Sequence, residues 1–277
     1  MVVNAFNLKN MKLNIVVLMK QVPDTRVVTG STILPDGTIN RKALPTIINP
    51  NDMQALEMAL CVKDTYPQSC VTVLSMGPDS AKSVIKEAMY RGADKGFLLS
   101  DAAFAGSDTL ATSRILSVAI QQIGQVDVVF CGRQTIDGDT AHVGPQVAQW
   151  LGVNQVTAVT SMQLASDRRC CLNRLGDAIE ETVEATLPLL VTVDESADAC
   201  RFRQAKRVMA YKNEVVPVWT AAQLGIDATQ CGLGGSATQV VTSQPVDLNV
   251  KESCVIENNT ESIETWFSEL LNTCIIA

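Results

Sequence analysis

The chain has 277 residues, of which 47% are hydrophobic, and a formal net charge of −7. This length and hydrophobic content suit one large α/β domain with appended segments, and the 22 Lys and Arg residues form no basic cluster that would neutralise a nucleic-acid backbone. The longest apolar runs fall short of the roughly 20 residues of a membrane-spanning helix, so we expect neither a nucleic-acid partner nor a membrane span.

The nine cysteines are scattered, no Cys-x-x-Cys pair occurs, and the chain has a single histidine. This pattern fits neither a disulfide framework nor a zinc site, so we expect a reducing, cytoplasmic location and no bound metal. The first ten residues lack the long apolar core of a signal peptide. We interpret residues 1–10 as a disordered leader, or as the product of an upstream start codon.

The first half of the chain alternates apolar runs with helical patterns, which is typical of βαβ units and a parallel sheet. The dipeptides Asn49-Pro50, Gly77-Pro78 and Ser107-Asp108 mark helix starts. Each start follows the end of a strand, where such sheets bind ligands. The expected strands are 13–19, 70–76, 96–99 and 126–131, and the expected helices are 51–64, 79–90 and 108–123.

The segment 132–145 directly follows the fourth of these strands and is rich in glycines, carboxylates and hydroxyls. It leads into a helix that we expect to begin near Ala141, and free backbone N–H groups at a helix start favour phosphate. Gly132 and Gly138 allow the backbone to approach a ligand closely. On composition alone, the alternative is a polar surface loop whose Asp and Thr side chains cap the helix.

After Gly152 the pattern changes to short apolar runs with a turn signal at Gly176-Asp177, which predicts a β meander that extends the first domain. The expected strands of this meander are 156–164, 170–175, 178–185 and 187–193.

Beyond residue 195 the alternation fades, and we expect one helix near 203–212, a Gly-rich loop at 232–236 and an amphipathic helix near 262–273. Such a tail cannot build a core alone. It either folds back onto the first domain or embraces another polypeptide, and we favour the second. Its large apolar residues are Trp219, Trp266, Phe267, Leu270 and Leu271.

No motif for phosphoryl or acyl transfer is present, because the chain lacks a Walker-type Gly-Lys-Ser/Thr and a Gly-x-Ser-x-Gly elbow. His142 has no catalytic partner in the sequence, and we interpret it as a ligand contact rather than an acid or base. We therefore predict no catalytic side chain. Any chemistry must come from a bound cofactor.

Several sequence pieces follow one another in a characteristic order, namely 12–25, 48–52 with 55–57, 75–78, 91–94, 132–144, 184–193 and 218–225. With these pieces the chain resembles the β subunits of electron-transfer flavoproteins over about residues 11–250.

The resemblance implies a Rossmann-like parallel sheet with helices on both faces, and a heterodimer with an α subunit that carries an FAD. It implies a nucleotide-binding domain at 11–195, and a partner-recognition segment and arm at 196–277. In ordinary members the β-subunit site holds AMP as a structural element, whereas in electron-bifurcating members a second FAD accepts hydride from NADH. By match to the family motifs, the nucleotide contacts would be Leu18, Asn49, Asp52, Ser75, Met76, Gly77, Gly132, Arg133, Gln134, Thr135, Ile136, Asp137, Gly138, Asp139, Thr140, Ala141, His142 and Val143.

The loop that begins at Gly132 looks like the bifurcating form, Gly-Arg-Gln-Ala-Ile-Asp-Gly-Asp-Thr-Ala-Gln-Val-Gly-Pro, rather than the ordinary Gly-Lys-Gln-Ala-Ile-Asp-Asp-Asp. Gly138 removes one carboxylate beside the phosphates, which favours a diphosphate because close like charges repel. We therefore predict FAD, with AMP as the alternative, and Arg133 as a partner for phosphate or flavin.

Two departures from the family pattern stand out. His142 replaces the Gln of bifurcating relatives, and residues 194–203 replace a Leu-Asn-Glu-Pro-Arg-Tyr segment with which the family recognises an acyl-CoA dehydrogenase. The docking dehydrogenase is thus left open. Besides the AMP-holding subunit, a stand-alone nucleotide-binding protein of the stress type remains as an alternative of another class.

Overall fold

The computed structural model describes residues 11–24, 26, 44–165, 167–239 and 255–272. The chain divides into two compact units, Met1–Thr242 and Ser243–Ala277. The predicted leader, residues 1–10, lies outside the described residues.

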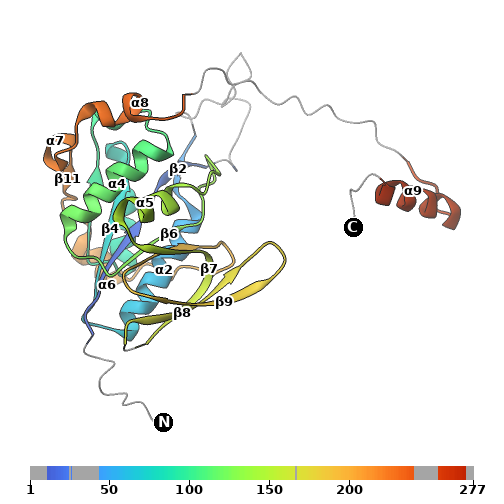
Figure 1. Cartoon of the computed structure of the whole chain (residues 1–277), viewed down its shortest axis with the longest axis horizontal. Coiled ribbons are helices and arrows are strands. Elements are labelled where there is room, and N and C mark those ends of the chain that lie inside the picture. Colours follow the sequence, from blue (N-terminus) through green and yellow to red (C-terminus); the bar gives the residue numbers. More distant parts are fainter. Residues whose placement is uncertain (1–10, 25, 27–43, 166, 240–254, 273–277) are drawn as a thin grey trace, which may run out of the picture. The chain divides into compact units, whose positions relative to one another are not determined.

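The first unit is built on a mixed sheet, several strands of which are labelled in Figure 1. Its strand order is β11-β5-β4-β1-β6-β10-β7-β8-β9. All pairs from β11 to β7 are parallel, and β7-β8 and β8-β9 are antiparallel. A small second sheet pairs β2 (Gln21–Pro23) with β3 (Thr46–Ile48). The strands of the large sheet are β1 (Asn14–Leu18), β4 (Cys70–Met76), β5 (Lys95–Leu99), β6 (Val128–Gly132), β7 (Asn154–Leu164), β8 (Arg169–Leu175), β9 (Glu180–Thr186), β10 (Leu189–Val193) and β11 (Val218–Trp219).

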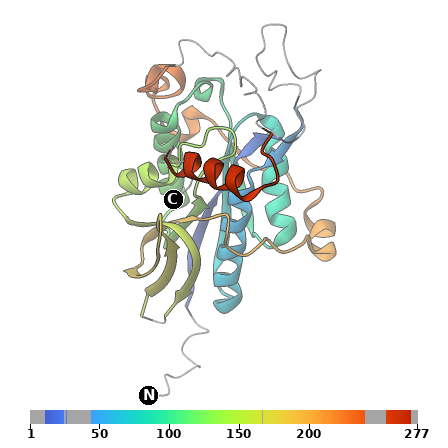
Figure 2. The same ribbon diagram turned by 90° about the vertical axis from the view of Figure 1, so that its right-hand side faces the viewer.

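Helices cover both faces of the parallel part, as Figure 2 shows, so the predicted α/β fold class is confirmed. Strand β1 explains the two layers, because its side chains point alternately to opposite faces. Ile15 and Val17 belong to a core cluster with α2 (Pro50–Thr65) and α3 (Lys82–Arg91). Val16 and Leu18 belong to a second cluster with α4 (Thr109–Ile123) and α5 (Val143–Leu151).

The fourth strand of the predicted meander, 187–193, was wrongly placed. It forms β10, which lies between β6 and β7 and is parallel to both. All five residues of β10 are buried, as expected of a parallel strand covered on both faces. The continuous apolar run from Leu189 to Val193 carried this signal, because a half-exposed meander strand would alternate.

Strand β7 changes partner along its length. Residues 154–159 pair with β10 and residues 159–164 with β8, and Ala158, at the irregularity in the β10 pairing, has a positive φ of 56°. An irregularity of this kind bends a strand and increases its twist. The antiparallel strands β7, β8 and β9 confirm the predicted hairpin, whose turn is closed by Gly176 N donating to Ile179 O.

The segment after β10 returns to the first unit. Trp219 of β11 stacks on Phe97 with ring centroids 4.1 Å apart, so this large apolar residue folds back onto the sheet rather than reaching outward. The predicted loop at 232–236 is partly wrong, because residues Gly232–Gly235 form the short helix α8. Gly232 is required there, since its φ is +56° and a Cβ would lie 2.5 Å from the Ala103 carbonyl oxygen.

The predicted helices near 203–212 and 262–273 are α6 (Ala205–Tyr211) and α9 (Thr260–Asn272). The short 3₁₀ turns and helix α7 complete the described elements. They are Asp79–Ala81, Ala102–Phe104, Ala221–Leu224 and Ala228–Gln230.

Candidate nucleotide site

A pocket of about 390 Å³ opens at the carboxyl ends of β1, β4 and β6. One wall is the loop after β6, and the opposite wall is the start of α4 with the turn before it. The predicted residues that line the pocket are Leu18, Asp52, Met76, Gly132, Arg133, Gln134, Thr135, Gly138, Thr140, Ala141, His142 and Val143.

Asn49 and Asp52, at the start of α2, hold the loop in place from below. Asn49 is fully buried, its Nδ2 donates to the Gln134 carbonyl at 2.9 Å, and its Oδ1 accepts from the Ile136 N–H at 3.3 Å. Asn49 occupies the N-cap position of α2 but makes no side-chain cap. Its amide therefore positions the loop and does not line the pocket.

Asp52 joins three elements at the pocket floor. Its Oδ2 accepts the backbone N–H of Lys20 at 2.8 Å, and its Oδ1 accepts that of Gly132 at 3.0 Å. Burial raises the pKa of Asp52 to about 6, against the lowering effect of these hydrogen bonds. Gly132 is fixed by this contact, because a Cβ there would lie 2.6 Å from Asp52 Oδ1.

The two flexible cations of the pocket are both held by carboxylates. Lys20 Nζ lies 2.8 Å from Asp137 Oδ2, and Arg133 Nη1 lies 3.1 Å from Asp194 Oδ2. Burial acts to raise the pKa of Asp194, but hydrogen bonds from Ser196 and Arg133 outweigh it and hold the pKa below its ordinary value. The expected partner of Arg133 was phosphate or flavin, and in the structure it is Asp194.

The start of α5 presents free backbone donors to the pocket. His142 is the N-cap residue, and no side chain caps the helix. Within the described residues, the N–H groups of residues 140–144 donate no hydrogen bond. Asp139 and Ala141 have positive φ angles of 47° and 54°, an uncommon conformation for residues other than glycine. Unpaired N–H groups at a helix N-terminus form a binding site for an anion.

Gly144 allows α5 to lie close to the sheet. A Cβ at this position would be 2.8 Å from both Cys131 Sγ and Thr192 Cγ2. The first turn of α5 is therefore seated directly on the ends of β6 and β10.

Six predicted residues do not line the pocket. Besides Asn49, they are Ser75, Gly77, Ile136, Asp137 and Asp139. Strand alternation turns Ser75 away from its neighbours Leu74 and Met76, which line the pocket. Its Oγ is buried without a hydrogen-bond partner among the described residues. Gly77 N donates to the Leu99 carbonyl, Ile136 and Asp137 are held by Asn49 and Lys20, and Asp139 is exposed.

The α4 wall was missed by sequence reasoning. Asp108 caps α4, its Oδ1 accepting from Ala111 N at 3.0 Å, and its Oδ2 accepts from both N and Oγ1 of Thr238. Asp108 N donates to Ser236 Oγ, and Gly232 N donates to Ser107 Oγ. The sequence placed the Ser107-Asp108 helix start at the ligand-binding edge of the sheet, but no residue of this start was included among the predicted contacts. The lining residues that were not predicted are Met19, Lys20, Leu74, Phe104, Gly106, Ser107, Asp108, Thr109, Thr112, Leu116, Cys131 and Gly144.

Comparison with known proteins agrees with this architecture. The model of the electron transfer flavoprotein domain matches residues 36–224. The chain is 42% identical over 231 residues to the electron transfer flavoprotein subunit beta of Clostridium acetobutylicum, covering 83% of this chain and 87% of that protein. The chain belongs to the electron transfer flavoprotein family.

Other relatives in the family carry different names. The Caffeyl-CoA reductase-Etf complex subunit CarD of Acetobacterium woodii is 40% identical, over 83% of this chain and 87% of that protein. Protein FixA of Rhizobium meliloti is 42% identical, over 82% of this chain and 80% of that protein. Because the relative from Clostridium acetobutylicum is a β subunit of the family, the chain functions in electron transfer that involves a flavin. The same relationship implies an α subunit as its partner. The resemblance inferred from the sequence is confirmed.

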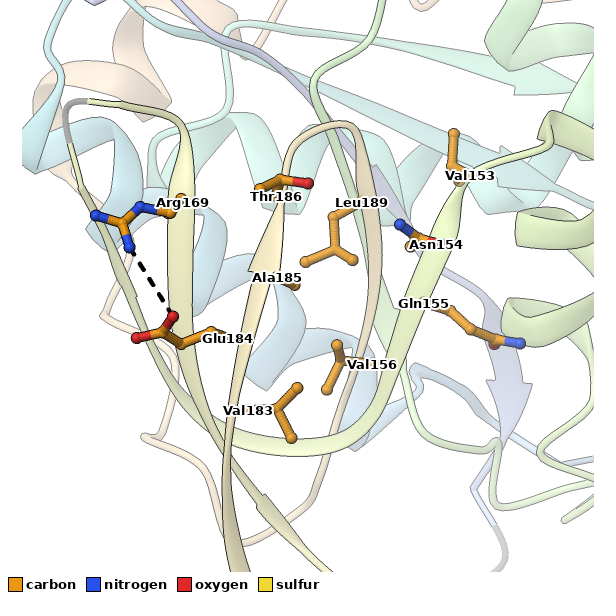
Figure 3. Close-up of a pocket in the computed structure, with 10 residues that line it drawn as sticks. All are labelled: Val153, Asn154, Gln155, Val156, Arg169, Val183, Glu184, Ala185, Thr186 and Leu189. Atoms are coloured by element: carbon orange, nitrogen blue, oxygen red, sulfur yellow. Dashed lines mark ion pairs between the residues drawn. The ribbon is translucent and has the colours of Figure 1, made fainter.

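A second hollow of this electron transfer flavoprotein subunit, of about 660 Å³, lies among β7, β8, β9 and β10 (Figure 3). Its inner side chains are apolar, among them Val156, Val183 and Leu189, and its rim carries an ion pair in which Arg169 Nη1 lies 3.9 Å from Glu184 Oε2. It has no uncapped helix start and no glycine loop. As far as the structure describes this hollow, it therefore lacks a row of free backbone N–H donors like that at the start of α5, and its one lining arginine, Arg169, is paired with Glu184.

The remaining expectations concern metals and membranes. Across the described ranges, no group of three or more His, Cys, Asp or Glu side chains is arranged to hold a metal ion. In the same part of the chain, no helix is long and apolar enough to cross a membrane.

Proposed function

We propose that this β subunit holds the adenylate end of an FAD in the pocket at the carboxyl edge of its sheet. Together with an FAD-carrying α subunit, it transfers electrons between NADH, or an acyl-CoA or related dehydrogenase, and further acceptors by flavin-based bifurcation. The observation that carries the proposal is the row of unbonded N–H groups, residues 140–144, at the uncapped start of α5.

These donors suit a pyrophosphate. Backbone N–H groups and the positive end of the helix dipole both favour negative charge at this point. Lys20 and Arg133 line the same pocket and add cationic side chains. The apolar side chains of Leu18, Leu74 and Met76 line the pocket and supply a surface suited to an adenine ring.

Gly138 supports a diphosphate over a monophosphate. It lines the pocket, and a Cβ at this position would meet only Thr135 Oγ1, at 3.7 Å. The backbone would therefore accept a side chain at this position. Because the residue is glycine, no side chain and no charge occupy this part of the pocket. A carboxylate at this position would stand beside the phosphates and repel them.

AMP as a structural nucleotide is the second candidate, and the size of the pocket favours it. The enclosed volume of about 390 Å³ lies toward the lower end of the range for small-molecule sites. In this second proposal, the walls of this chain alone would suffice for a nucleotide of about the size of an adenylate. If FAD is the ligand, its flavin end must extend beyond these walls.

We propose that residues 196–277 serve partner recognition, with the terminal arm on the α subunit. Helix α9 has no buried residue within its own unit, and Ile263, Trp266, Phe267 and Leu271 are all more than 40% exposed. Their spacing forms one apolar stripe along the helix. Exposed apolar stripes of this kind mark interaction surfaces.

The segment after β10 is our candidate for the surface that a dehydrogenase contacts. Arg201 Nη2 lies 2.8 Å from Glu57 Oε1 on α2, and Arg203 Nη2 lies 2.8 Å from Glu87 Oε2 on α3. These pairs fix the backbone on both sides of Phe202, which is 90% exposed. A fixed, exposed aromatic side chain is a common anchor of protein interfaces.

In this proposal, bound FAD supplies the redox chemistry and the chain supplies binding and orientation. The N–H groups at the start of α5 hold the phosphates, and Asn49 and Asp52 keep the loop in the binding shape. No side chain of this chain is required to act as an acid, base or nucleophile.

The test counts nucleotides released by denaturing the complex purified with its α subunit. Two FAD per heterodimer support the proposal, whereas one FAD and one AMP support the structural alternative. Gly138→Asp adds the charge, and Gly138→Asn is a matched control of equal size without it. We expect Gly138→Asp to lose the FAD of this chain, with AMP still able to bind, while Gly138→Asn keeps the FAD. Retention of two FAD by the Gly138→Asp complex would show that the pocket is misplaced.

A further inference from the structure

The single histidine of the chain stands at the mouth of the nucleotide pocket. His142 lines the pocket, its side chain is exposed, and it occupies the N-cap position of α5. Its carbonyl accepts the N–H of Gln146 at 3.0 Å. Among the described residues, its imidazole makes no hydrogen bond and no ion pair.

The other cationic side chains that line the pocket are already paired. Lys20 is bound by Asp137, and Arg133 by Asp194. A ligand that draws on either cation must compete with a carboxylate of the protein. The imidazole of His142 has no such competitor in the described part of the chain, and it is next to the free N–H groups that suit an anion.

We propose that His142 is a proton-dependent ligand for the phosphate of the bound nucleotide, so that binding takes up a proton and tightens as pH falls. This inference rests on the proposed nucleotide site. Histidine is suited to the role because its charge changes near neutral pH. Imidazolium attracts a phosphate, and neutral imidazole offers at most one hydrogen bond without charge.

The sign of the effect follows from linkage. If the anion binds the charged imidazole better, it must favour protonation of His142, and each proton must in turn favour the anion. Affinity therefore falls as pH rises through the titration of the imidazole. If the protein with a protonated imidazole binds the anion about tenfold more tightly than the protein with a neutral one, the bound anion shifts the midpoint of the imidazole titration upward by about one pH unit.

Other charged groups around the pocket affect the size of the change. Asp52 lies on the α2 side, and its pKa of about 6 means that it also becomes negative in this pH range. Its ionisation weakens anion binding in the same direction, so a part of the pH dependence remains without His142. Fixed charges come from Asp108 at the N-cap of α4, from Asp137 and Asp139 in the loop, and from Asp194 directly after β10.

The first experiment follows the imidazole itself. The untagged chain contains one histidine, so ¹³C-histidine labelling gives one side-chain signal to titrate by NMR. The titration is recorded for the free chain and in saturating FAD, AMP or adenosine. We expect its midpoint to move to higher pH with FAD or AMP and to stay in place with adenosine, which lacks phosphate.

The second experiment measures FAD affinity between pH 5.5 and pH 8 by fluorescence quenching. FAD is the suitable probe because its two phosphates are diesters whose charge is constant in this range, whereas the monoester of AMP loses a proton near pH 6. His142→Gln keeps a donor without a titrating charge, and His142→Lys keeps the charge throughout the range. We expect about a tenfold loss of affinity with rising pH in the wild type, a smaller loss in His142→Gln and tight binding at pH 8 in His142→Lys.

The outcomes separate this inference from the proposed function. If neither FAD nor AMP binds the wild-type chain or its complex, the proposed function fails. If a nucleotide binds but the histidine titration is the same with and without phosphate, only the role of His142 is overturned. An undiminished pH dependence in His142→Gln would likewise assign the whole effect to another group.

Discussion

The two walls of the nucleotide pocket are built by different means. The loop wall, residues 132–144, follows a strand directly and is fixed from inside by the buried side chains of Asn49 and Asp52. The α4 wall is fixed from outside by Ser236 and Thr238, more than a hundred residues away in sequence. The loop wall therefore depends on the core of the domain. The α4 wall depends on the segment that leads toward the C-terminal unit.

The largest effect is expected from removing Asp52, the inner anchor of the loop wall. It is compared with the removal of Asp108, which joins the α4 wall to its outer anchor, residues 236–238. Asp52→Ala leaves the backbone N–H groups of Lys20 and Gly132 without an acceptor, which we expect to lower the free energy of unfolding by about 3 kcal/mol. Asp108→Ala removes a helix cap and two bonds to Thr238 at the surface, with an expected cost of about 1 kcal/mol. Urea denaturation of both variants measures the difference, and equal losses would contradict the contrast between the walls.

The second prediction compares two glycines within the loop wall. Gly132→Ala places a Cβ 2.6 Å from Asp52 Oδ1 and 2.7 Å from Asn51 Cβ, so the start of α2 must shift. We expect a loss of about 2 kcal/mol from overpacking. Gly138→Ala is the matched control, because its Cβ meets nothing closer than 3.7 Å and its stability should match the wild type. A Gly132→Ala variant as stable as Gly138→Ala would mean that the floor is looser than the structure indicates.

The residues of the loop wall were largely predictable from sequence, whereas for the α4 wall only the helix start at Ser107-Asp108 was predicted and not its place in the pocket. An apolar strand followed by glycines, carboxylates and a helix start indicates a ligand edge from neighbouring residues alone. Of the predicted range 132–143, all but Ile136, Asp137 and Asp139 line the pocket, and their contact with a nucleotide stays a prediction. Phe104 and Thr109 carry no such local pattern, and their place opposite the loop follows from strand order. Asn49 was predicted as a nucleotide contact, whereas in the structure it supports the loop, a role that depends on burial that local sequence does not encode.

The same distinction between local sequence pattern and position in the sheet explains which strands were predicted correctly. Strands β1, β4, β5 and β6 were predicted because each is an apolar run followed by a helical pattern. Strand β10 was assigned to the meander because it follows β9 directly, although it inserts between β6 and β7. Two-residue β11 was missed because its length gives no periodicity, and Trp219 is placed by stacking on Phe97.

A third prediction uses pH to contrast the two anchoring carboxylates. The pKa of Asp52 is raised by burial to about 6 from an ordinary value of 3.8, so its contribution to stability is present below pH 3.8 and is lost as pH rises through 6. Asp108 behaves in the opposite sense. Burial acts to raise its pKa, but hydrogen bonds from Ala111 and Thr238 outweigh burial and lower it, so its contribution is lost as pH falls below the ordinary range.

Urea denaturation from pH 3 to pH 7 measures both effects. Between pH 5 and pH 6, Asp52 should lower the free energy of unfolding by up to about 1.4 kcal/mol for each rise of one pH unit. Asp52→Asn should remove this slope, whatever its effect on stability at a single pH. Asp108→Asn should leave that slope unchanged and should reduce only the loss of stability at the acidic end. A slope between pH 5 and pH 6 that survives in Asp52→Asn would assign the titration to another group.

The smallest effect is expected from single changes at residues 236–238. These changes test whether the contacts of this segment with Asp108 act as one unit or independently. Thr238→Val removes the Oγ1 bond to Asp108 but keeps the backbone N–H bond, so we expect a loss of about 0.5 kcal/mol. Combined with Asp108→Ala, it should add almost nothing, because both changes remove the same interaction. Ser236→Ala, which removes the acceptor of the Asp108 N–H, should add its full cost to Thr238→Val. A double-mutant cycle by thermal denaturation measures these couplings. Full additivity of Thr238→Val and Asp108→Ala would mean that residues 236–238 are held by other contacts, and that the α4 wall does not depend on this segment.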